Sequence, residues 1–116
     1  MTDYNPVRIE QAISECANKI AQSVPVCGER YTEFRTAERQ YDLAYARAYV
    51  NANGPAHEKR YQATLATETE REKLDVADAA YRFADREAKA AEAELRAIQS
   101  LGASVRQAYD VVGRRP

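Results

Sequence analysis

The chain has 116 residues, of which 45% are hydrophobic, enough for one domain with a modest core. Its 17 Lys and Arg residues nearly balance 18 Asp and Glu residues, so the formal net charge is -1 and does not indicate a nucleic-acid or anionic-membrane ligand. No apolar run approaches the roughly 18 residues that cross a bilayer, and residues 1–23 lack the apolar segment of a signal peptide. We therefore expect a cytoplasmic protein without membrane contact.

Two amphipathic helices are predicted in the first half of the chain. Asn5 and Pro6 form an N-cap and first-turn pair of a helix over about residues 6–23. The apolar residues that recur on one face of it are Ile9, Ile13, Cys16 and Ile20. Residues 24–28 contain proline and glycine and predict a break. A second helix is expected over about residues 29–51, with one apolar seam formed by Phe34, Ala37, Tyr41, Ala44 and Ala48.

A short helix and one long helix are predicted in the second half. Residues 51–55 combine Asn, Gly and Pro and form the strongest stop signal of the chain. Residues 55–66 then predict a short helix that carries Tyr61 and Leu65 inward. Thr67 or Thr69, each followed by acidic residues, is the predicted entry to a long helix over about residues 68–112, and Thr69 with Glu72 fits a capping box. Whether the short helix is separate or continues through a bend at Thr67 stays open.

The long helix carries a heptad seam, because apolar side chains recur along it at alternating spacings of three and four. Its members are Leu74, Ala77, Tyr81, Ala84, Ala88, Ala91, Leu95, Ile98, Gly102, Val105, Tyr109 and Val112. A second apolar stripe beside it includes Val76, Ala80 and Phe83, so the apolar arc is wide enough for two neighbouring helices. Acid-first pairs such as Asp78 with Arg82 indicate a solvated opposite face.

These elements predict an all-α fold in a single helical domain over residues 1–116. The predicted architecture is an antiparallel helical hairpin with one long, coiled-coil-like C-terminal helix and an N-terminal helix packed along its groove. Because the predicted second helix spans about 22 residues and the long helix about 45, one end of the long helix would outrun its partner. This mismatch predicts a surface for another protein, with a homodimer as its simplest form.

No motif for catalysis, metal binding or a cofactor is present, so we expect a protein that is not an enzyme and has no cofactor. His57 is the only histidine, and the acidic residues around Glu70 are typical of a helix N-terminus. Cys16 and Cys27 lack CxxC spacing and are interpreted as small buried residues with free thiols.

The aromatic residues point to an interaction surface, because the chain has eight tyrosines and no tryptophan. The residues predicted to bind a protein partner are Tyr45, Tyr49, Phe83 and Leu101. An alternative is binding of single-stranded nucleic acid, for which the Arg residues near the end of the chain are the candidates: Arg96, Arg106, Arg114 and Arg115. A third hypothesis is a structural coiled-coil oligomer of a virion or scaffold.

Several short runs resemble a group of short helical proteins of unassigned function that are encoded by bacteriophages and prophages, especially those of actinobacteria. The resemblance covers roughly residues 41–106 and rests on Tyr-Ala-Arg-Ala-Tyr at 45–49, Asn53 and Gly54, ATLATETERE at 63–72, residues 74–80, and LRAIQSLGASVR at 95–106. It implies an accessory or host-modulating role in a bacterial cell, exerted on a host, defence or recombination factor. It implies no functional residues.

Overall fold

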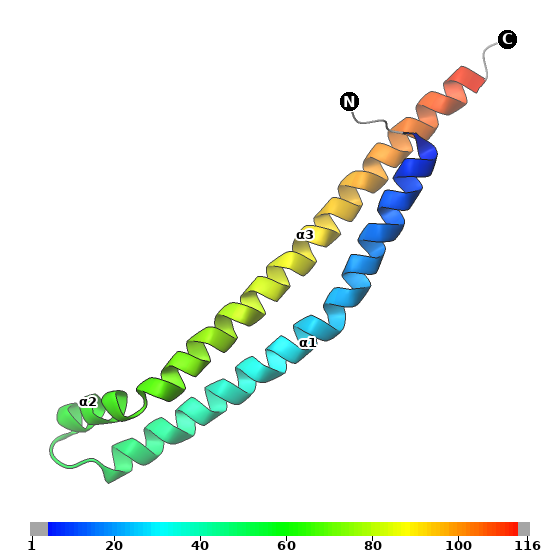
Figure 1. The fold of residues 1–116 in the computed structure, drawn as a ribbon. Helices are drawn as coiled ribbons and strands as arrows, with labels where there is room; N and C mark the ends of the chain where they lie inside the picture. The colour runs from blue at the N-terminus through cyan, green and yellow to red at the C-terminus, as the bar shows by residue number, and fades with distance from the viewer. Residues whose placement is uncertain (1–4, 114–116) are drawn as a thin grey trace. The chain divides into compact units, whose positions relative to one another are not determined.

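The computed structural model describes residues 5–113, and every regular element among them is an α-helix (Figure 1). The helices are α1 (Pro6–Asn51), α2 (Ala56–Ala66) and α3 (Glu68–Gly113). The long C-terminal helix α3 packs against α1, which confirms the predicted all-α hairpin. None of the described helices is long and apolar enough to cross a membrane.

The predicted break at residues 24–28 is wrong, because α1 continues through it with Pro25 inside the helix. Proline removes one backbone donor, the one that would bond the carbonyl of Ala21, and leaves the bonds on either side intact. The Ser23 hydroxyl donates to the carbonyl of Ile20 at 2.6 Å, and that of Thr32 donates to the carbonyl of Gly28 at 3.0 Å. α1 contacts α3 before and after the proline, through Cys16 and Cys27, and this packing offsets the local cost of about 3 kcal/mol.

This correction removes the predicted length mismatch between the packed helices. α1 and α3 each contain 46 residues. The predicted first and second helices are parts of one helix that follow the same seam of α3, so they are not two separate neighbours. The predicted difference of about 22 against 45 residues is therefore wrong. A shorter overhang is left, because α3 continues past the start of α1 and its Tyr109 and Val112 are exposed there.

The chain divides into two compact units, each of which pairs part of α1 with part of α3. In the unit formed by residues 5–25 and 85–113, the core contains Ile9 and Cys16, as the helical spacing predicted. The Cys16 thiol donates to the carbonyl of Ala91 at 3.1 Å. A Cβ built on Gly102 would lie 3.0 Å from Ile9 Cγ2, so the backbone of α3 closely approaches α1 here. The two helices are antiparallel.

The unit formed by residues 26–84 has an aromatic cluster on the same seam. The Tyr81 ring stacks on Phe34 with centroids 5.9 Å apart, and it meets Tyr31 edge-on at 5.3 Å. Cys27, a free thiol like Cys16, donates to the carbonyl of Ala84 at 3.5 Å. Because α1 positions rise as α3 positions fall, these contacts are antiparallel as well.

The turn after α1 is formed at the predicted stop signal in residues 51–55. Gly54 has a φ of 102°, a conformation that glycine adopts without a steric penalty. The Gln62 side-chain amide donates to the Asn53 carbonyl at 2.7 Å and accepts from the Asn53 amide at 3.4 Å, which ties the turn to α2.

The predicted inward face of α2 is wrong, because Tyr61 and Leu65 are 69% and 75% exposed. Ala63 and Thr67 are buried instead. The small Ala63 side chain lets α2 lie close to the rest of the unit, whereas the large residues point to solvent. α2 is separate from α3, which starts at Glu68. The Thr67 carbonyl accepts the Arg71 amide at 2.9 Å, so Thr67, one of the two predicted entry residues, precedes the helix, and the Thr69 and Glu72 capping box does not form its start.

Candidate partner-binding surface

One apolar stripe of α3 is left uncovered within the unit of residues 26–84. We call it the α3 stripe and define it as Val76, Ala79, Ala80 and Phe83. Val76 and Phe83 are 66% and 64% exposed, although they lie one heptad apart on the same side of the helix. The sequence predicted a second stripe here and expected a second neighbouring helix to cover it. α1 covers only the seam around Tyr81, so that second neighbour is missing from the described residues.

The stripe borders an open groove between α1 and α3 of about 540 Å³, which we call the α1/α3 groove. Its lining residues are Arg30 and Glu33 from α1, and Thr69, Glu72, Lys73, Val76, Ala77 and Ala80 from α3. Small alanine side chains form the floor, so another helix backbone could approach closely. Phe83 follows Ala80 by one turn and extends the apolar wall beyond the groove.

Charged residues of both signs surround the apolar floor of the groove. Arg30 pairs with Glu33 along α1 at 3.2 Å, and both side chains are about half exposed. Glu72 and Lys73 are adjacent on α3 and exposed. An apolar centre with a mixed charged rim is typical of protein interfaces.

The opposite, solvated face of α3 forms the ion pairs that the sequence predicted. Arg82 Nε donates to Asp78 Oδ1 at 2.8 Å, and Lys89 Nζ lies 2.8 Å from Asp85 Oδ2. The hydrogen bond to Asp78, followed by the attraction of its negative charge, raises the pKa of the Arg82 guanidinium above its ordinary value. These ion pairs keep this face of α3 polar.

Of the residues predicted to bind a partner, Phe83 lies in the α3 stripe. Tyr45 is half-buried, with its ring 6.1 Å from that of Tyr41, and Tyr49 is half-buried with Lys59 Nζ 5.8 Å from its ring centroid. Leu101 is half-buried in the other unit. Phe83 is thus the predicted residue with the largest free apolar surface of the four.

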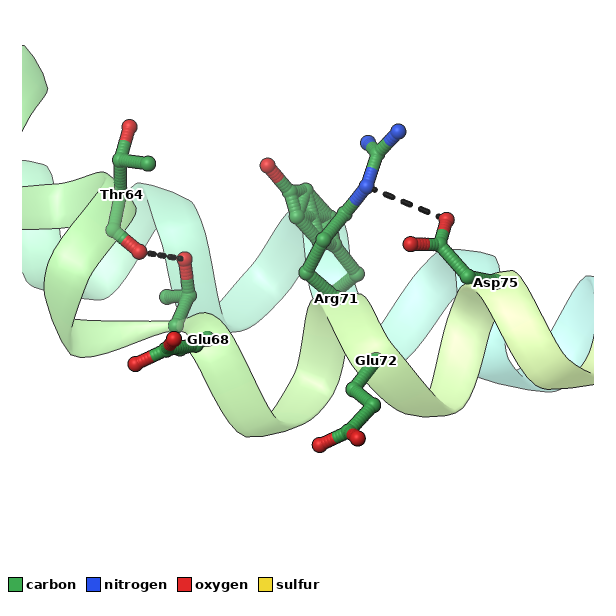
Figure 2. Close-up of a pocket in the computed structure, with 7 residues that line it drawn as sticks. Thr64, Glu68, Arg71, Glu72 and Asp75 are labelled. Carbon is green, nitrogen blue, oxygen red and sulfur yellow. Dashed lines mark hydrogen bonds and ion pairs between the residues drawn. The ribbon is translucent and has the colours of Figure 1, made fainter.

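A second hollow lies at the junction of α2 and α3 and has a volume of about 340 Å³ (Figure 2). Polar residues line most of it: Tyr41, Thr64, Thr67, Glu68, Arg71, Glu72 and Asp75. Arg71 Nε pairs with Asp75 Oδ1 at 3.3 Å, and the Arg71 guanidinium lies 5.3 Å from the Tyr41 ring centroid. The one cation of this hollow is therefore already engaged within the protein.

The acidic residues that begin α3 have a structural explanation. Glu68 and Glu70 lie in its first turn, where a helix favours negative charge. Within residues 5–113, no group of three or more His, Cys, Asp and Glu side chains is placed to hold a metal ion. His57 is exposed on α2.

The arginines of the nucleic-acid alternative are not assembled into a described site. Arg96 and Arg106 are exposed on α3, and Arg106 Nε donates to the carbonyl of Gly102 at 3.3 Å. Arg114 and Arg115 lie outside the described residues. Nucleic-acid binding stays a prediction from composition.

Sequence reasoning missed the charged rim of the groove: Arg30, Glu33, Glu72 and Lys73. A signal for two of them was present, because Glu72 and Lys73 precede Val76 by one turn of the same helix. Arg30 and Glu33 needed the α1 and α3 register, which periodicity does not supply.

No known protein family, curated protein or solved structure matches this chain.

Proposed function

We propose that this chain is a non-enzymatic accessory protein that acts by binding another protein through its helical hairpin. The observation that supports this function is the exposure of Val76 and Phe83 beside the α1/α3 groove. Burial of such side chains contributes about 1.5 to 3 kcal/mol each, and exposed aromatic residues beside a groove are common centres of binding energy.

The partner segment that fits this groove is an amphipathic helix. Two antiparallel helices present a groove in which a third helix places apolar residues at spacings of three and four. Ala77 and Ala80 allow close approach, while the charged rim can pair with polar residues of the incoming helix. The resemblance to phage and prophage proteins extends the proposal to a host, defence or recombination factor in the cytoplasm of a bacterial cell.

Site-specific photo-crosslinking in bacterial cells tests this function. A photoreactive residue replaces Phe83 in one variant and Leu43 in a matched control, since Leu43 is half-exposed on α1 and does not line the groove. We expect a protein adduct at position 83, mapped by mass spectrometry to one face of a helix, and none at position 43. Absence of a protein adduct at position 83, or identical adducts at both positions, would contradict the proposal.

A further inference from the structure

The residues on either side of the α3 stripe form a self-complementary charge pattern. Lys73 and Glu87 lie seven residues before and after Ala80, and Glu72 and Arg86 lie seven residues before and after Ala79. Seven residues correspond to two helical turns, so Lys73 and Glu87 lie on the same flank of α3 as Ala80. Glu72 and Arg86 lie on the same flank as Ala79. All these positions follow from the helical repeat of α3 alone.

We propose that the helix that occupies the α3 stripe is α3 of a second copy, packed antiparallel about a two-fold axis beside Ala79 and Ala80. This inference rests on the proposed protein-binding function and names a second copy, in place of a host factor, as the protein that binds the α3 stripe. Lys73 of each copy then pairs with Glu87 of the other on the flank nearer α1. Glu72 pairs with Arg86 on the other flank, so the symmetric contact contains four pairs of opposite charge.

The apolar residues favour the same antiparallel pairing. Val76 lies three residues before Ala79, and Phe83 lies three residues after Ala80, so the axis places Phe83 of one copy against Val76 of the other. The alanines meet at the centre, where their small side chains allow the helices to approach. A parallel pairing would place Phe83 on Phe83 and hold the alanine turns apart.

The contact is small, because it involves about four turns of one helix from each copy. Specific dimers usually bury about 800 Å² per partner, so this interface is at the low end of the range. We therefore expect a reversible dimer with a dissociation constant of about 10 to 100 µM.

Sedimentation equilibrium of the full chain from about 1 µM to about 1 mM tests the inference. The wild-type mass should rise from monomer toward dimer across this range. Lys73→Glu or Glu87→Lys alone should weaken the dimer by about tenfold or more, because each change places like charges together twice. An equimolar mixture of the two variants should recover dimerisation, because both contacts are again between opposite charges.

Control variants separate this surface from general effects on folding. Phe83→Ala should weaken the dimer, whereas Leu43→Ala should leave it unchanged, and circular dichroism should show unchanged helicity in every variant. A wild-type chain that stays monomeric throughout, or a mixture no more dimeric than its separate components, would overturn the second-copy inference. If photo-crosslinking at position 83 then still captures a different protein, only the identity of the partner is refuted. If it captures none, the proposed function fails too.

Discussion

Two glycines inside helices allow the close approach of α1 and α3 to be measured by equivalent substitutions. A Cβ built on Gly28 in α1 meets no atom within 4 Å, whereas one on Gly102 in α3 lies 3.0 Å from Ile9 Cγ2. Alanine stabilises a helix interior by about 1 kcal/mol relative to glycine, so we expect this full gain for Gly28→Ala. Gly102→Ala has the same gain, but it forces the buried Ile9 side chain to move, which costs about 1 to 3 kcal/mol.

We expect the two Gly→Ala substitutions to change the free energy of unfolding by different amounts or in opposite directions. Urea denaturation followed by circular dichroism should show Gly28→Ala more stable than wild type by about 1 kcal/mol and Gly102→Ala between equal and about 2 kcal/mol less stable. Ile9→Ala removes the contacting Cγ2, so Gly102→Ala made in that background should recover its gain. Equal stabilisation by both substitutions in the wild-type chain would refute the close approach of Gly102 to Ile9.

Three further substitutions test the unit formed by residues 26–84, each by denaturant unfolding. Thr67→Val keeps the shape of a buried side chain and removes its 2.8 Å hydrogen bond to the carbonyl of Ala63, so we expect a loss of about 1 kcal/mol; a Thr67→Val variant as stable as wild type would contradict a role for the hydroxyl. Gly54→Ala should cost about 1 kcal/mol because of the φ of 102°, and this loss should persist after Glu58→Ala removes the nearest side chain; a neutral effect would argue against the turn conformation. Tyr81→Ala removes two ring contacts and should cost about 2 kcal/mol, less than a fully buried aromatic residue, whereas a loss below about 0.5 kcal/mol would show that the cluster contributes little.

The apolar seam of α3 could be predicted from the sequence because its spacing alone determines which side faces a helix. From Leu74 to Val105 every seam residue is buried or half-buried, whereas Tyr109 and Val112 at the end are exposed. The spacing of apolar residues predicts which side of α3 packs against another helix, but it does not predict the residue at which that packing ends.

The continuity of α1 could not be predicted in the same way. Pro25 and Gly28 are unfavourable in an isolated helix, and only packing on α3 compensates for them. The same limit explains α2, where the buried residues are the small Ala63 and Thr67 and not the larger Tyr61 and Leu65. Hydrophobicity predicts how much free energy the burial of a side chain would contribute. The space between the packed helices determines which side chain is small enough to be buried.

Of the candidate surface, the sequence predicted Phe83 and the stripe around it, but for a different reason. α1 is as long as α3, so the predicted overhang of the long helix is reduced to its last turns, where Tyr109 and Val112 are exposed. The continuity of α1 that shortens the overhang also leaves α3 with one neighbouring helix, although its apolar arc has room for two. The unfilled position lies along the side of the hairpin rather than at its end, and Val76 and Phe83 are exposed for that reason. Because the two predicted N-terminal helices are one helix, the candidate interface lies on the side of α3. The charged residues two turns from Ala79 and Ala80 can discriminate between partners there.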